Sequence, residues 1–105
     1  MGMNYYAVLN RPTTRFPIHI GKLSSGWLFV FQEQFFWHNY EEVKQWLSKH
    51  KDYLILNEHD YEYTLKEFLD MIDETQNDPE RLSNPDNFKY DKNVNGYRFQ
   101  EDEFI

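Results

Sequence analysis

The chain has 105 residues, of which 40% are hydrophobic and 19% are aromatic, and it contains no cysteine. This length suits one domain, since typical domains run to about 100–150 residues, and a cysteine-free chain has neither a disulfide scaffold nor a thiolate zinc site. The net charge of −7 is concentrated after residue 57, where fourteen acidic residues accompany five basic ones. Direct binding to nucleic acid is therefore disfavoured, because phosphate contacts need clustered Lys and Arg.

Two features predict a cytoplasmic protein with no membrane contact. The longest apolar run, residues 27–31, is far shorter than the ~20 residues that a membrane-spanning helix needs. No basic segment followed by an apolar one opens the chain, so no secretory signal is expected.

The first third of the sequence predicts a strand followed by a hairpin. Residues 4–9 are aromatic and β-branched, which is typical of a strand, and Asn and Pro residues in 10–17 predict a loop. Residues 18–20 resume an extended pattern and residues 21–26 have the Gly and Ser content of a turn. Residues 27–31 are apolar at both odd and even positions, which point to opposite faces of a strand. This pattern predicts a central strand that is covered on both faces.

Alternation along that last strand assigns its side chains to two faces. Trp27, Phe29 and Phe31 are expected on one face of the sheet, and Leu28 and Val30 on the other.

The middle of the chain predicts two helices with a strand between them. Asn39 three residues before a Glu favours a helix over 40–49, and residues 53–56 form an apolar run typical of a strand that ends in a turn over 57–60. The sequence from Thr64 has the capping-box spacing and then apolar residues at i, i+3, i+4 and i+7, which predicts an amphipathic helix through about residue 74.

The last third is expected to be less regular. Residues 75–87 are rich in Asn, Asp, Pro and Ser without periodicity, which predicts an exposed linker. Residues 88–90 and 97–99 flank Asn95-Gly96, a dipeptide that favours tight hairpin turns, so a C-terminal hairpin or tail is expected over 88–105. We therefore predict one α+β domain. A small, mostly antiparallel sheet packs against two helices in a compact core over 3–74, followed by an irregular acidic C-terminal segment.

The segment from His19 to Phe29, HIGKLSSGWLF, resembles the H-I-G-K-x-S-x-G-W-x-F segment of a group of small, uncharacterised proteins of tailed bacteriophages. Further similar features follow in order along nearly the whole chain, including the Gly96-Tyr97-Arg98-Phe99 sequence and Glu103-Phe104. Many relatives carry a Cys-x-x-Cys pair before this segment, whereas residues 10–15 here contain no cysteine. The resemblance implies a phage source and an infected bacterial cell as the location, and it implies no mechanism.

The same segment offers a candidate ligand site. His19, Lys22, Ser24 and Ser25 could present a positive charge and backbone N–H groups to an anion or a nucleotide, although the spacing is not that of a phosphate-binding P-loop. Trp27, at the end of this segment, is a further candidate binding residue. The structural alternative is that the Gly and Ser residues only shape the turn and that Trp27 begins the core strand.

Catalytic and metal-binding interpretations have little support. The four histidines lack any zinc-ligand spacing, and no G-x-S-x-G elbow is present, so no metal, no cofactor and no catalytic residue is predicted. A non-enzymatic role is favoured over catalysis.

Two other surfaces are candidates for protein contacts. The run 35–38 contains three large rings that cannot all face one core, so Phe36 and Trp37 are candidate contact residues, with core packing as the alternative. Acidic residues of the second half form a candidate surface that could imitate nucleic acid, with solvation as the alternative; they are Asp70, Asp73, Glu74, Asp78 and Glu80.

The function predicted from these features is that of a phage-encoded interaction protein that modulates a host bacterial protein, in host takeover or anti-defence. The alternative is a small-ligand or nucleotide-binding protein that uses the His19–Ser25 turn. The sequence is also compatible with a homo-oligomer.

Overall fold

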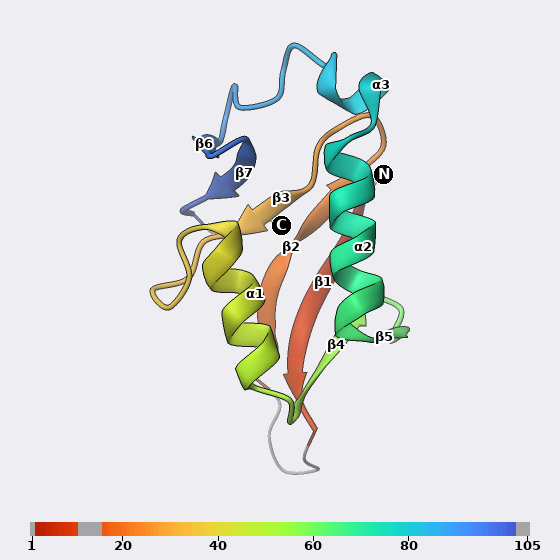
Figure 1. The fold of residues 1–105 in the computed structure, drawn as a ribbon, viewed down its shortest axis with the longest axis vertical. Coiled ribbons are helices and arrows are strands. Elements are labelled where there is room, and N and C mark those ends of the chain that lie inside the picture. Colours follow the sequence, from red (N-terminus) through yellow and green to blue (C-terminus); the bar gives the residue numbers. More distant parts are fainter. Residues whose placement is uncertain (1, 11–15, 103–105) are drawn as a thin grey trace.

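Within residues 2–10 and 16–102, which the computed structural model describes, seven strands form one mixed sheet in the order β5-β4-β1-β2-β3-β7-β6 (Figure 1). Neighbouring strands are antiparallel except β3 and β7, which are parallel. The strands are β1 (Gly2–Leu9), β2 (Ile18–Ser24), β3 (Val30–Gln32), β4 (Tyr53–Asn57), β5 (Glu62–Tyr63), β6 (Lys92–Val94) and β7 (Tyr97–Gln100).

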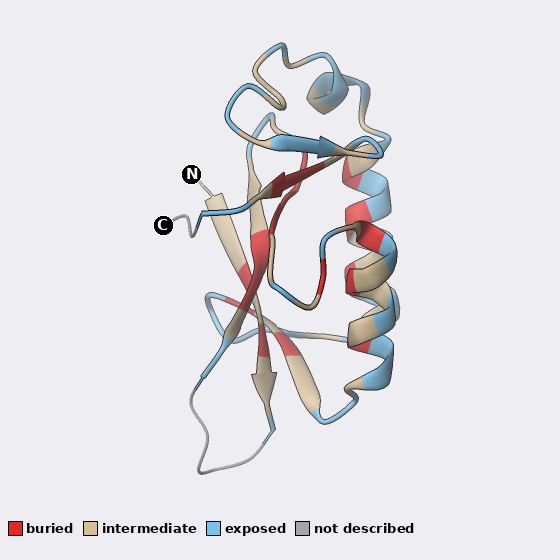
Figure 2. Ribbon diagram, turned by 90° about the vertical axis from the view of Figure 1, so that its left-hand side faces the viewer, coloured by how far each residue is buried: buried red, intermediate tan, exposed pale blue. Residues whose placement is uncertain are grey.

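Two helices, α1 (Tyr40–Lys49) and α2 (Leu65–Gln76), lie on the same side of the sheet (Figure 2). The side chain of Asn39 caps α1, and a reciprocal capping box joins Thr64 and Glu67 at the start of α2. The α+β fold with a mostly antiparallel sheet against two helices is therefore confirmed. Among the described helices, none has both the length and the apolar character needed to cross a membrane.

The core lies between the sheet and these two helices. Aromatic rings fill its centre, where Phe31 contacts Phe29 and Phe99 with ring centroids 4.7 and 4.9 Å apart. The buried hydrophobic residues of this cluster are Tyr5, Ala7, Ile20, Phe29, Phe31, Trp37, Tyr40, Val43, Leu47, Ile55, Phe68, Ile72 and Phe99. α1 and α2 are each apolar on one face only. Each helix buries that face against the sheet, which gives two layers.

The predicted turn over 21–26 is wrong, because Gly21 to Ser24 continue β2. Gly21 pairs with Phe31 of β3, and a Cβ at Gly21 would lie 2.3 Å from the Val30 carbonyl oxygen. Glycine is needed here for close strand approach, not for a turn. The real turn is Ser25-Gly26, with Gly26 at a φ of 81°.

The predicted strand over 27–31 is also shorter than expected and its side chains are arranged differently. β3 begins at Val30, and Trp27 lies under the Arg98 guanidinium, 4.9 Å from the ring centroid, outside the core cluster of Phe29 and Phe31. The same guanidinium forms an ion pair with Asp91 and donates to the Leu28 carbonyl oxygen at 2.6 Å. Trp27 therefore belongs to a polar cluster with the C-terminal hairpin.

Part of the stretch 75–87, which was predicted to be an exposed linker without periodicity, is helical. α2 contains Thr75, which is buried, and ends at Gln76. Asp78 caps a one-turn helix, α3 (Pro79–Leu82). The Arg81 guanidinium then donates to the carbonyl oxygens of Ser24 and Trp27, at 2.9 and 2.6 Å. This polar segment has no apolar stripe to pack against the sheet. Hydrogen bonds to the β2–β3 connection hold it in position instead.

The C-terminal hairpin is confirmed at Asn95-Gly96, but its first strand is β6 at 92–94, not 88–90. It is part of the sheet, because β7 pairs with β3 and Phe99 is fully buried. The core therefore extends past residue 74. The central part of the predicted 10–17 loop, like Glu103 and Phe104, lies outside the described residues.

Candidate functional site

A groove of about 900 Å³ lies beside the N-terminal half of β2. It forms there because β3 pairs with β2 only at Gly21 and Lys22, so no described strand pairs with this edge of β2 at 18–20. The groove is lined by Asn4, Tyr6, Phe16, Pro17, Ile18, His19, Gln32, Glu33, Gln34, Phe36 and Glu101. Its surface is thus mixed, with aromatic, amide and acidic side chains.

A chain of hydrogen bonds fixes the histidine of this groove. Glu58 accepts from the backbone N–H and the side-chain Nδ2 of Asn4, at 2.7 and 3.2 Å, so the Asn4 Oδ1 faces His19 Nε2 at 2.9 Å. Because an amide oxygen only accepts, the imidazole donates through Nε2. The Tyr6 ring stacks on the imidazole with centroids 5.1 Å apart. Hydrogen bonds from Asn4 hold the pKa of Glu58 below its usual value, so Glu58 is an ionised anchor.

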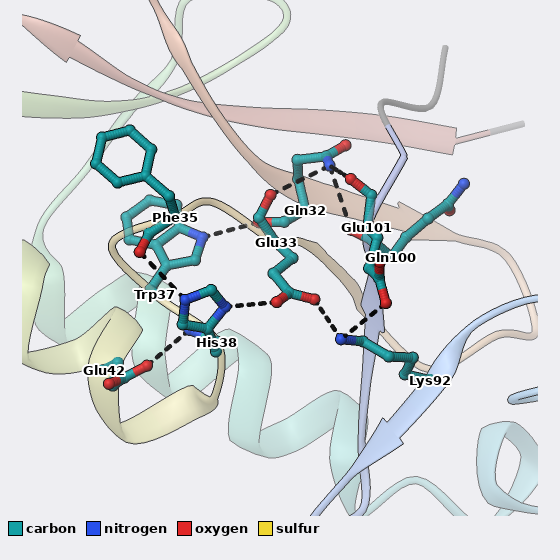
Figure 3. A network of polar contacts seen from close by, with 9 residues as sticks. All are labelled: Gln32, Glu33, Phe35, Trp37, His38, Glu42, Lys92, Gln100 and Glu101. Carbon is teal, nitrogen blue, oxygen red and sulfur yellow. Dashed lines mark hydrogen bonds and ion pairs between the residues drawn. The ribbon is translucent and has the colours of Figure 1, made fainter.

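Glu33 forms the centre of a second polar network (Figure 3). One carboxylate oxygen lies 2.5 Å from His38 Nδ1, and the other lies 2.5 Å from the Lys92 ammonium, which also reaches Glu101 at 3.2 Å. Burial raises the pKa of Glu33, but the contacts with Lys92 and His38 outweigh it and the net direction is downward. The hydrogen bond to Glu33 raises the pKa of His38. The network connects the 33–39 loop to β6 and to the end of β7.

Exposed aromatic rings flank the groove. Phe16 is 86% exposed, and Phe35, next to the half-buried Phe36, is 90% exposed. Phe36 is held in place by edge-on contact with Phe35 at 5.1 Å and by stacking on Trp46 at 5.3 Å. Trp37 lies in the core, where its Nε1 donates to the Gln32 carbonyl oxygen, so the exposed ring of this run is Phe35.

The structure separates the residues of the predicted ligand site. His19 lines the large groove, whereas Lys22, Ser24 and Trp27 line another hollow of about 230 Å³ beside Arg98, and Ser25 is exposed in the turn. The expected anion site depended on a turn over 21–26, and the backbone there is part of β2 instead.

The predicted acidic surface runs along α2 and α3, and three of its five residues have local partners. Asp70 pairs with Lys66 at 2.6 Å, and Asp73 accepts from the Tyr40 hydroxyl at 3.0 Å. Asp78 caps α3 and lies 3.4 Å from the Arg81 guanidinium. Glu74 and Glu80 are exposed. Much of this acidity therefore serves helix caps and surface pairs.

Sequence reasoning did not select Asn4, Tyr6, Phe16, Glu33 and Glu101, which the fold brings together around His19 and Phe36. A signal was present for two of them. Phe16 is a large apolar residue between predicted strands, and Glu33 is a single charge between two aromatic runs. Both patterns indicate side chains with a role outside the core.

Within the described part of the chain, no group of three or more His, Cys, Asp or Glu side chains is arranged to hold a metal ion. In comparisons with known proteins, no family model, no curated protein and no solved structure matches the chain.

Proposed function

We propose that this protein is a non-enzymatic interaction protein that binds another protein through the groove between Phe16 and Phe36. The observation that carries the proposal is a pair of exposed rings at a groove of about 900 Å³: Phe16 lines the groove, and Phe35 contacts Phe36, another lining residue. Large aromatic side chains placed beside a concave surface supply most of the binding energy of many protein interfaces.

The strand edge beside the groove supports the same proposal. Within the described residues, no strand pairs with Ile18–Ile20 on the groove side, where the Gln34 amide donates to the His19 carbonyl oxygen at 3.2 Å. An extended partner segment adds readily to a sheet edge, where main-chain hydrogen bonds give affinity and neighbouring pockets give specificity.

The biological setting is proposed from the resemblance of residues 19–29 to tailed-phage proteins. The partner is then a host bacterial protein, modulated in the cytoplasm of the infected cell during host takeover or to counter a defence. The uneven acidic charge of the chain supports a partner whose contact surface is basic.

The test is an affinity pull-down from bacterial lysate with the tagged wild-type protein and a variant that carries Phe16→Ser and Phe35→Ser. Tyr90→Ser is the matched control, because Tyr90 is 74% exposed and does not line the groove. A true partner should be captured by the wild type and the control, with at least about tenfold weaker binding to the double variant. Equal capture by all three proteins would contradict the proposal.

A further inference from the structure

We propose that the groove recognises a cationic side chain, an arginine or a lysine, carried by an extended segment of the partner protein. This inference rests on the proposed function and names the chemistry of its partner. Three features of the groove carry it: the charge of its lining, its aromatic faces and the position of Lys92.

Among the described residues that line the groove, the charged side chains are acidic. They are Glu33 and Glu101, and no described Lys or Arg lines the groove. Glu101 is 68% exposed and Glu33 is 15% exposed, so Glu101 is the more accessible of the two. A third carboxylate, Glu58, does not line the groove but accepts from the lining residue Asn4. This arrangement is complementary to a positive charge.

Aromatic faces supply the second half of a cation site. Tyr6, Phe16 and Phe36 line the same groove as the two carboxylates. An ammonium or guanidinium group is attracted to such a face within about 6 Å of the ring centroid. The described residues already show this geometry three times, with Lys44 at 4.7 Å from the Tyr40 centroid, Arg98 at 4.9 Å from that of Trp27 and Lys89 at 5.6 Å from that of Tyr90.

Lys92 makes the inference sharply testable. Its ammonium contacts both Glu33 and Glu101, yet it approaches from β6 and does not line the groove (Figure 3). A partner cation therefore competes with Lys92 for the same two carboxylates. Removal of the Lys92 charge should strengthen binding of the cation, whereas removal of the Glu101 charge should weaken it.

The probe is the peptide acetyl-Gly-Ala-Arg-Ala-Gly-amide, titrated into the ¹⁵N-labelled full chain and followed by amide chemical shifts. The control peptide carries citrulline in place of arginine, which keeps the shape and removes the charge. We expect shifts at Asn4, His19 and Gln34, with the arginine peptide binding about two- to fivefold more tightly than the citrulline peptide.

Two pairs of variants accompany the titration. Glu101→Gln should reduce arginine-peptide affinity about two- to fivefold, and Lys92→Met should increase it by a similar factor. Glu80→Gln and Lys89→Met are the matched controls, since both side chains are exposed and lie outside the groove. Neither control should change the affinity.

The outcomes separate this inference from the proposed function. Equal binding of both peptides in the groove, or no response to Glu101→Gln and Lys92→Met, overturns the cation inference while the groove remains a peptide site. Shifts confined to α2 and α3, or no binding of either peptide, overturn the cation inference as well. The pull-down with the Phe16 and Phe35 variant tests the proposed function independently.

Discussion

Gly21 shows how a single residue sets the spacing of the two central strands. A Cβ at this position would lie 2.3 Å from the Val30 carbonyl oxygen and 2.4 Å from a ring carbon of Phe29. Neither neighbour can move easily, because one is backbone and the other is fully buried. We therefore expect Gly21→Ala to destabilise the fold by about 1–3 kcal/mol, as overpacked core substitutions do.

The measurement is urea unfolding of Gly21→Ala beside Ser25→Ala, which changes an exposed turn residue close by. Ser25→Ala should unfold like the wild type. Wild-type stability of Gly21→Ala would show that β2 and β3 are further apart than described.

The pair of Glu33 and His38 predicts a pH dependence of stability with a defined sign. The pKa of His38 is raised above its ordinary value of 6.5 by Glu33, and the Glu42 carboxylate, which accepts from the His38 backbone N–H, adds to the effect. The stabilisation that comes from the positive charge of His38 is therefore complete below about pH 6.5 and is lost as the pH rises through the raised pKa. The pKa of Glu33 is lowered, so its contribution is present above its ordinary 4.5 and lost as the pH falls through the lowered value.

This prediction is checked by NMR titration of the His38 ring. Its midpoint should lie above 6.5, and Glu33→Gln should move it back toward that value. A midpoint at or below 6.5 in the wild type would contradict the pairing. In His38→Gln, the fall in unfolding free energy on the alkaline side should become smaller.

At the scale of elements, α2 has a boundary that depends on two side chains. Thr64 accepts from the Glu67 backbone N–H at 3.0 Å, and the Glu67 carboxylate accepts from the Thr64 N–H at 2.8 Å. Removal of the cap leaves helical N–H groups without this partner, so Thr64→Ala should cost about 0.5–2 kcal/mol. Thermal unfolding monitored by circular dichroism measures it, with Thr64→Ser as a conservative variant that should retain most of the stability. If Thr64→Ala unfolds at the same temperature as the wild type, the capping box does not contribute to stability.

Elements specified by local signals were predicted well, and elements specified by distant contacts were not. The helix at 65–76 has its cap and apolar stripe in consecutive residues, so periodicity alone located it. Gly21 to Ser24 have the composition of a turn, and their strand conformation comes from pairing with β1 on one side and, at Gly21 and Lys22, with β3 on the other. α3 depends on hydrogen bonds from Arg81 to residues more than 50 positions away.

The same distinction applies to the candidate site. His19 and Phe36 could be selected because a histidine in a strand and an aromatic run are visible locally. Their assembly with Asn4, Glu33 and Glu101 depends on the order of strands in the sheet, which no local pattern specifies. The sequence could therefore identify two residues of the groove, but it could not predict the groove itself.

At the scale of the whole molecule, the C-terminal hairpin completes the core. Phe99 is fully buried and stacks on Phe31 across the parallel β3–β7 pair. We expect Phe99→Ala to destabilise the protein by about 3–5 kcal/mol, because a buried ring leaves a cavity. Phe99→Leu should lose much less, and urea unfolding of both variants provides the comparison. A small effect of Phe99→Ala would mean that residues 3–74 hold the core alone.

The parallel pairing of β3 with β7 has a consequence for the order in which the protein matures on the ribosome. Val30 pairs with Arg98 of β7, the second neighbour of β3. β7 is therefore translated after every other described strand and helix. Synthesis adds about 5–20 residues per second, and a nascent chain therefore carries β3 with one open edge for seconds before β7 can close it. During that interval the backbone N–H and C=O groups on that edge of β3 lack their β7 partners.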